Sequence, residues 1–178
     1  MLKKLGLILS VIVIIIGISW WSISSPGRNN NACAFCDPII VQNQTFYQDN
    51  FVTCLCTHKP VQEYHCLIVT KRHIERFEQA TEEEITAIGR AIKKIDRAVQ
   101  KINGPSSYIL LQKNGHDVGQ TVPHVHVHYI PKKISNNKLA PYNFLWSFIV
   151  SLFKQPIEQE QLAINVKDMR QAVTQQTF

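Results

Sequence analysis

The segment that most constrains the fold is Pro123-His-Val-His-Val-His-Tyr-Ile-Pro131, in which histidine alternates with apolar residues between two prolines. Successive side chains of a β-strand point to opposite faces, so the pattern predicts a strand with His124, His126 and His128 on one face. Neighbouring imidazoles would then lie about 6.6 Å apart, at about 3.3 Å of rise per residue. Histidine is only intermediate in burial, and each ring has two nitrogens that need partners. Three in register therefore favour binding to a metal, to phosphate or to each other over simple packing.

The sequence around this strand predicts an α+β domain with a mainly antiparallel sheet of about five strands and one long helix. Thr81 and Glu84 have the spacing of a capping box, which marks the start of the helix. Isoleucine and valine then recur at spacings of three and four until Asn103-Gly104-Pro105 ends the pattern. The strands are expected in short β-like runs at 45–47, 51–56, 64–69, 108–112 and 124–130.

A charge-free stretch runs from Leu5 to Gly27. Its apolar run is longer than the core of a signal peptide, about 7–15 residues, so it predicts a transmembrane helix, with a cleaved signal peptide as the alternative. Lys3 and Lys4 precede the stretch, and only Arg28 follows it closely. The positive-inside rule then places the N-terminus in the cytoplasm. We therefore expect a single-pass membrane protein whose folded domain faces outward.

Three parts are expected along the chain. Residues 1–28 would form the anchor (or signal peptide) and a tether, 29–133 the folded domain, and 134–178 a C-terminal extension. The apolar run 142–153 is too short to cross a bilayer of about 30 Å as a helix, so it packs on the domain or lies amphipathically in a membrane interface. The net charge is +6, but much of the basic excess lies outside 29–133, so nucleic acid is not an expected partner.

Five cysteines define a second possible site. Cys33 and Cys36 have the spacing of a tetrahedral zinc knuckle, which needs two further ligands. The alternative is a disulfide between them, which an outward-facing domain would permit. The remaining three, Cys54, Cys56 and Cys66, are interpreted as small buried residues.

Together these segments resemble the histidine triad (HIT) family, named for His-x-His-x-His followed by two apolar residues, here Tyr129 and Ile130. The resemblance covers about residues 33–133. It rests on Cys33-Ala-Phe-Cys36, the stretch from His65 to Ile74, the capped helix, and the loop and strand from Asn114 to Pro131. It implies a HIT-like fold, here preceded by the expected transmembrane helix, and a homodimer, which is common in the family.

The resemblance also implies an activity. The chain would be a nucleotide hydrolase or transferase acting on the α-phosphate of nucleoside phosphoramidates or (di)nucleoside polyphosphates. His126 would be the nucleophile that forms a covalent nucleotidyl-histidine, and His128 would bind a phosphate oxygen and pass a proton to the leaving group. The implied substrate-binding residues are Asn114, Gly119, Gln120, Thr121 and His65. A structural Zn²⁺ would be bound by Cys33, Cys36, His73 and His124.

Two other interpretations stay open. In one, His124, His126 and His128 are the ligands of a catalytic zinc with an open water position. In the other, the chain is a membrane-attached nucleotide-binding module without turnover. The metal count and a covalent protein intermediate distinguish the first from HIT chemistry, and binding without hydrolysis would identify the second.

Overall fold

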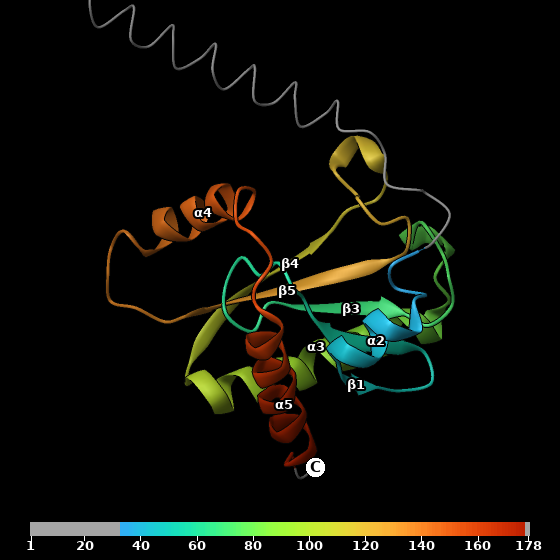
Figure 1. Cartoon of the computed structure of the whole chain (residues 1–178), viewed down its shortest axis with the longest axis horizontal. Coiled ribbons are helices and arrows are strands. Elements are labelled where there is room, and N and C mark those ends of the chain that lie inside the picture. Colours follow the sequence, from blue (N-terminus) through green and yellow to red (C-terminus); the bar gives the residue numbers. More distant parts are fainter. Residues whose placement is uncertain (1–32, 177–178) are drawn as a thin grey trace, which may run out of the picture. The chain divides into compact units, whose positions relative to one another are not determined.

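An antiparallel five-stranded sheet, in the order β1-β2-β3-β5-β4, is the centre of the computed structural model, which describes residues 33–176 (Figure 1). This confirms the predicted α+β class and the number and direction of the strands. The strands are β1 (Thr45–Gln48), β2 (Val52–Cys56), β3 (Cys66–Thr70), β4 (Ser106–Gln112) and β5 (His126–Lys133).

The long helix α3 (Glu82–Asn103) begins at the predicted capping box. Thr81 Oγ1 accepts a hydrogen bond from Glu84 N at 3.3 Å, and Glu84 Oε2 accepts one from Thr81 N at 2.8 Å. The buried stripe of the helix is shifted from the predicted one, because Ile85 is 38% exposed while alanines enter the core. Among the buried residues are Ala87, Ile88, Ala91, Ile95, Ala98 and Val99.

Two helices that the sequence did not predict flank the sheet. Helix α2 (Pro38–Gln44) begins at Asp37, whose Oδ1 accepts a hydrogen bond from Ile39 N at 2.8 Å, with proline in the first turn. Helix α5 (Gln159–Thr174) packs beside α3 and contributes Val166, Met169, Ala172 and Val173 to the core. The C-terminal extension therefore belongs to the same compact unit as the sheet. This unit begins at Cys33.

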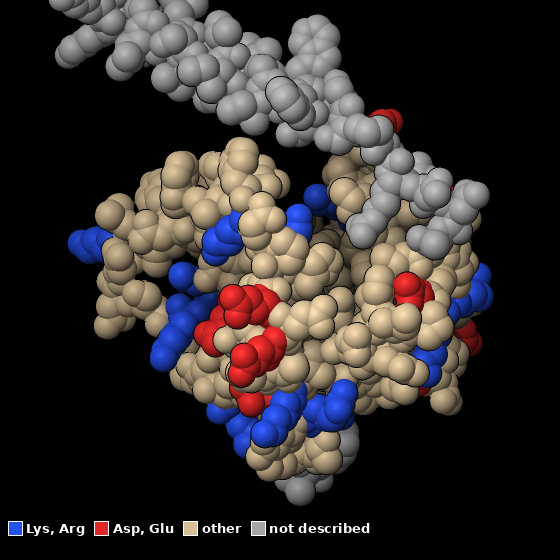
Figure 2. All heavy atoms as spheres, viewed as in Figure 1, with Lys and Arg blue, Asp and Glu red and all other residues tan. Residues whose placement is uncertain are grey.

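Helix α4 (Ala140–Ser151) contains no charged residue and no buried residue. Figure 2 shows that the surface over it is almost free of charged side chains in this view. Trp146 is 62% exposed, whereas Ser147 Oγ accepts a hydrogen bond from Gln62 Nε2 at 2.7 Å and so attaches the helix to the domain. The alternative of binding in a membrane interface is not tested by the structure and stays a prediction.

The predicted localisation is corrected. Within residues 33–176, the structure contains no helix that combines the length and the apolar character needed to cross a bilayer. The expected span and membrane contact at 5–27 lie outside the described residues. The prediction of a single-pass membrane protein with a cytoplasmic N-terminus and an outward-facing domain is therefore not retained.

Candidate functional site

His126 and His128 lie on the sheet face opposite α3 and α5. Strand β3 pairs Val69 with His126 and Leu67 with His128, and the two imidazole centroids are 5.1 Å apart. The intervening Val127 is buried in the core under α3. The alternation of faces thus follows the prediction for these two histidines.

His124 departs from the predicted strand. Strand β5 begins at His126, two residues later than predicted, so His124 lies in the bend that leads into it. Its Nε2 lies 2.7 Å from Thr70 O, and the side chain is buried. A carbonyl oxygen only accepts, so Nε2 carries the proton and the lone pair of neutral His124 is at Nδ1.

His126 has the opposite tautomer. Its Nδ1 lies 2.6 Å from His124 O, so Nδ1 donates and the lone pair of the neutral ring is at Nε2. The side chain is 6% exposed, and burial lowers the pKa of His126 below its usual value of 6.5. His126 is therefore a neutral imidazole at pH 7 with one fixed nucleophilic nitrogen.

His65 and His128 form a chain of directed hydrogen bonds. Val61 N donates to His65 Nδ1 at 3.1 Å, so the proton of neutral His65 is at Nε2. His65 Nε2 lies 2.9 Å from His128 Nδ1 and donates to it, which leaves His128 with its proton at Nε2. Burial lowers the pKa of His65 to about 4. Burial, and then the proximity of His65, His126 and Lys113, lowers the pKa of His128 to about 3. His128 therefore presents an N–H donor.

The metal-ligand residues predicted from the resemblance converge. One ligand atom from each of Cys33, Cys36, His73 and His124 lies within 4.8 Å of all the others. His124 Nδ1 is 3.3 Å from Cys33 Sγ and 3.6 Å from Cys36 Sγ, and Cys36 Sγ is 3.3 Å from His73 Nδ1. Both cysteines are free thiols in the structure, so the disulfide alternative is not observed. This cluster could bind a metal ion.

The donor set fits a tetrahedral zinc ion. With Zn–S bonds of about 2.3 Å and Zn–N bonds of about 2.0 Å, tetrahedral ligands lie roughly 3.3–3.8 Å from one another, close to the distances above. The Thr70 carbonyl accepts a hydrogen bond from His124 Nε2 and so orients the His124 ring toward the metal position. The loop that carries His73 is tied to α3, because Arg72 binds both carboxylate oxygens of Glu84, at 2.8 and 3.1 Å.

The predicted phosphate-binding loop is fastened by its own side chains. Asn114 Oδ1 accepts from Phe77 N at 2.8 Å, and Asn114 Nδ2 donates to Glu78 Oε2 at 2.7 Å. Gln120 is 7% exposed, and its Nε2 donates to Glu75 O at 2.9 Å. These amides are engaged within the protein.

The other two predicted loop residues differ from these amides. Gly119 has a φ of 81°, a left-handed conformation that favours glycine. Thr121 is exposed. Gly119 N and Gln120 N donate within the loop, to His116 O at 2.8 Å and to Gly115 O at 3.1 Å. Among the predicted loop residues, the hydroxyl of Thr121 therefore matches the predicted role of donating to a phosphate.

Two residues near the histidines were missed by the sequence analysis. Lys113 Nζ donates to Gly119 O at 3.2 Å, and its positive charge contributes to the lowered pKa of both His126 and His128. Phe35 packs its ring edge to face with His126, with centroids 5.0 Å apart. The available signals were the position of Lys113 directly before Asn114 and the aromatic residue inside Cys33-Ala-Phe-Cys36.

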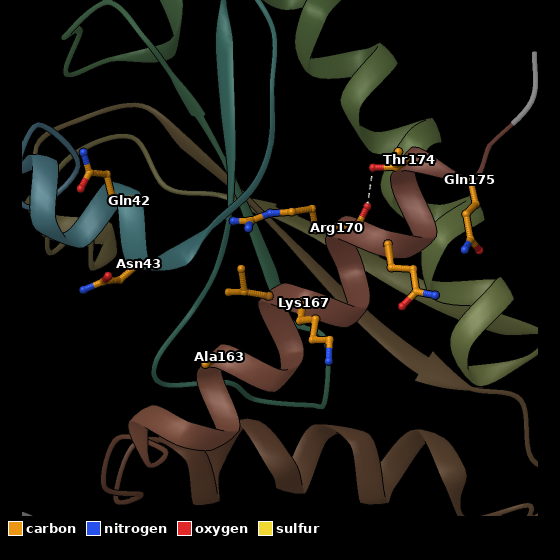
Figure 3. Close-up of a pocket in the computed structure, with 9 residues that line it drawn as sticks. Gln42, Asn43, Ala163, Lys167, Arg170, Thr174 and Gln175 are labelled. Atoms are coloured by element: carbon orange, nitrogen blue, oxygen red, sulfur yellow. Dashed lines mark hydrogen bonds between the residues drawn. The ribbon is translucent and has the colours of Figure 1, made fainter.

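A separate hollow of about 610 Å³ lies between α2 and α5 (Figure 3). Its lining includes Lys167 and Arg170, and Arg170 Nη2 donates to Thr45 O at 2.6 Å. None of the predicted site residues lines it. The candidate site is therefore the histidine face of the sheet and not this hollow.

Comparisons with known proteins agree with this geometry. The sequence pattern of the HIT domain family matches residues 41–134. The chain is 33% identical over 93 residues to the asymmetrical bis(5'-nucleosyl)-tetraphosphatase of Schizosaccharomyces pombe, covering 52% of this chain and 51% of that protein. It is 31% identical over 105 residues to an adenylylsulfatase of Arabidopsis thaliana, covering 58% and 53%. The chain thus spans about half the length of these relatives.

A solved structure shares the fold. The zinc-bound histidine triad family protein of Mycobacterium smegmatis superimposes with a TM-score of 0.58 at 20% identity, over 83% of this chain and 96% of that one. At this identity the likeness concerns the fold alone.

Proposed function

This chain belongs to the HIT domain family, and from that premise we propose that it is a nucleotide hydrolase or transferase acting at the α-phosphate of its substrate. Relatives named as a dinucleoside tetraphosphatase and an adenylylsulfatase support two substrate classes, (di)nucleoside polyphosphates and mixed nucleotide anhydrides. Nucleoside phosphoramidates are a third proposed class. Because the chain spans about half of those proteins, its own substrate is part of the proposal.

The observation that carries the proposal is the tautomer of His126. Its Nδ1 proton is bound to His124 O at 2.6 Å, and its buried ring is neutral, so Nε2 keeps a lone pair for attack on phosphorus. In the first step the Nε2–P bond forms while the bond from phosphorus to the leaving atom breaks. In the second step water attacks phosphorus, the P–Nε2 bond breaks, and a nucleoside monophosphate leaves.

His128 is proposed as the proton donor to the leaving group. Its Nε2–H is set by the hydrogen bond from His65 to Nδ1, at 2.9 Å. The proton passes to the leaving atom in the first step, and a proton of the attacking water returns to Nε2 in the second. The exposed hydroxyl of Thr121 is proposed to bind a non-bridging oxygen, with Asn114, Gly119 and Gln120 holding the loop in shape.

We further propose that the metal bound by Cys33, Cys36, His73 and His124 is a structural Zn²⁺. The two thiols, the two imidazoles and the distances between their ligand atoms support this assignment. The ion would join Cys33 and Cys36 to His124, whose carbonyl oxygen accepts the hydrogen bond from His126 Nδ1. It would thereby orient the nucleophile.

The two alternatives have less support. A three-histidine zinc site needs all three rings to face one ion, but His124 Nε2 is bound to Thr70 O and its Nδ1 faces Cys33 and Cys36. If the chain only bound nucleotides, the fixed tautomers of His126 and His128 would have no catalytic purpose. A homodimer remains part of the proposal, because β4 is an edge strand with Ile109 and Leu110 42% and 44% exposed. Light scattering tests it.

The test uses the full chain and its His126→Ala variant. Both are assayed for release of nucleoside monophosphate from a panel of nucleoside 5'-phosphoramidates, adenylyl sulfate and dinucleoside polyphosphates. We expect turnover in the wild type that falls by more than about 10⁴-fold in the variant, with metal content and melting temperature retained. Substrate labelled at the α-phosphate should label the wild-type protein in an acid-quenched reaction. Turnover that survives the substitution would exclude His126 as the nucleophile.

A further inference from the structure

The segment between β2 and β3, residues 57–65, is bound by residues that lie beyond the family match. Ile157 N donates to His58 O at 2.9 Å, and Gln62 Nε2 donates to Ser147 Oγ at 2.7 Å. Tyr64 OH donates to Asp168 Oδ2 at 3.3 Å. We call Ser147, Ile157 and Asp168 the C-terminal clamp. All three follow residue 134, where the match to the HIT domain family ends.

Tyr64 has an unusual backbone conformation. Its φ is 56°, the only positive φ of a non-glycine residue within 33–176. L-residues with a side chain rarely adopt this region, so the surroundings must hold it there. Cys66 Sγ donates to Tyr64 O at 3.2 Å. The Tyr64 side chain is 6% exposed, and its hydroxyl donates to Asp168. Burial and nearby carboxylates raise the pKa of Tyr64 to about 12, so the phenol keeps the proton that it donates.

The conformation of Tyr64 determines where His65 lies. Tyr64 joins the core cluster under α3 and α5, whereas the ring of His65 contacts His128 on the opposite face, with centroids 5.1 Å apart. Adjacent residues thus point to the two faces of the sheet. The left-handed conformation of Tyr64 forms a turn in the chain. In this turn Val61 N contacts His65 Nδ1, and His65 Nε2 contacts His128. A change at the Tyr64 side chain would therefore displace the hydrogen bonds that set the His128 tautomer.

We propose that the C-terminal clamp, acting through Tyr64, is the positioning device of His65, and that it thereby sets the proton-donating tautomer of His128. Asp168 and Tyr64 are positioning residues, because Asp168 contacts Tyr64, and Tyr64 acts on His65 through the backbone that joins them. This inference rests on the proposed function, in which His128 protonates the leaving group. It gives the extension, which lies outside the family match, a role in the chemistry.

The experiment compares two substrates with the same nucleoside. One releases an aliphatic amine, which must be protonated as it leaves, and the other releases 4-nitrophenolate, which leaves as the anion at pH 8. In the full chain, Tyr64→Phe and Asp168→Ala should lower kcat for the amine substrate by about tenfold to 100-fold, since a misplaced group loses most of its effect. The kcat for the aryl substrate should change less than about twofold. Asp168→Asn, whose amide oxygen still accepts from Tyr64, should behave as the wild type.

A second readout does not depend on turnover. ¹⁵N chemical shifts of the imidazoles should show one tautomer, Nε2–H, for both His65 and His128 in the wild type, and a mixture in Tyr64→Phe. Two exposed neighbours provide matched controls, Tyr142→Phe on α4 and Lys167→Ala on α5, which should change neither readout. Ser147→Ala is a milder variant of the clamp, for use if Tyr64→Phe does not fold.

The outcomes separate this inference from the proposed function. If His126→Ala abolishes turnover but the clamp variants keep full activity on the amine substrate, or lose equal activity on both substrates, the inference is overturned. If the wild type has no turnover, the proposed function fails and the ¹⁵N tautomers decide the inference alone. A single tautomer that persists in Tyr64→Phe and Ser147→Ala would then reject it.

Discussion

His124 and His126 are two residues apart, and the structure holds their neutral rings in opposite tautomers. His124 donates from Nε2 to Thr70 O and directs Nδ1 to the cysteines, whereas His126 donates from Nδ1 to His124 O and keeps Nε2 unprotonated. The two tautomers differ because the backbone carbonyl of Thr70 binds Nε2 of His124, whereas that of His124 binds Nδ1 of His126. Chemically identical side chains in one motif thus present different ring nitrogens, because the hydrogen bond made by the second nitrogen differs.

The comparison extends to His128, whose Nδ1 accepts a hydrogen bond from His65 and does not donate. The three histidines of the motif thus present an Nδ1 lone pair, an Nε2 lone pair and an Nε2–H. A ligand, a nucleophile and a proton donor need these three forms respectively. Four predictions test the assignment.

Among these four, the largest effect is expected at His128. The change His128→Ala removes the Nε2–H donor, so kcat should fall by about 10³-fold for a substrate whose leaving group is an aliphatic amine. For a 4-nitrophenyl ester of the same nucleotide the loss should be far smaller, because that leaving group needs no proton. Steady-state kinetics with both substrates provide the measurement. Equal losses on the two would remove the distinction between a donor at His128 and a nucleophile at His126.

The second effect is expected at the metal cluster. Cys36→Ser should lower the zinc content from one equivalent per chain, measured by elemental analysis, and should lower the melting temperature by about 10 °C. A chelator should lower the melting temperature of the wild type and leave the variant unchanged. Wild-type protein purified without bound metal, and indifferent to added Zn²⁺, would contradict the role assigned to His124.

The third prediction concerns pH and stability. His65 has a folded pKa of about 4 against 6.5 in the unfolded chain, so between these values the unfolded state binds more protons. Stability is then complete above pH 6.5 and should decline as the pH falls toward 4, by about 3 kcal/mol from this group. Urea unfolding at pH 7, 6 and 5 measures the decline. His65→Gln should flatten the dependence, and the metal contribution cancels in the comparison. Parallel curves would show that His65 is not buried as a neutral ring.

The smallest effect is expected at Lys113, whose charge lies near both His126 and His128. Lys113→Ala should raise KM by about tenfold through the loss of one attraction to an anionic substrate, with little change in kcat. Added salt should reduce the difference between wild type and variant. Lys101→Ala on α3, whose Nζ donates to Gln175 Oε1 at 2.7 Å, is the matched control. A fall in kcat alone would mean that Lys113 acts on the histidines and not on substrate.

Much of the fold follows from local patterns. The capping box at Thr81 and the strand-like runs predicted α3 and the five strands, because capping and alternation depend on neighbours in sequence. The helix α5 was missed because only a few of its residues, including Met169 and Val173, are buried, and what they pack on is set by distant elements. The expected membrane span, 5–27, lies outside the described residues and does not contribute to the described fold.

Residue types and spacing alone determined that this chain has histidines alternating on a strand and cysteines two residues apart, since side-chain direction in a strand is local. The tertiary structure decided which nitrogen each histidine presents. Thr70, His65 and Asp168 reach the motif or its support from far along the chain, and their contacts select tautomers that no local pattern encodes. The physical reason is that either nitrogen of a neutral imidazole can carry its one proton, and the hydrogen-bond partner supplied by the fold determines which one does.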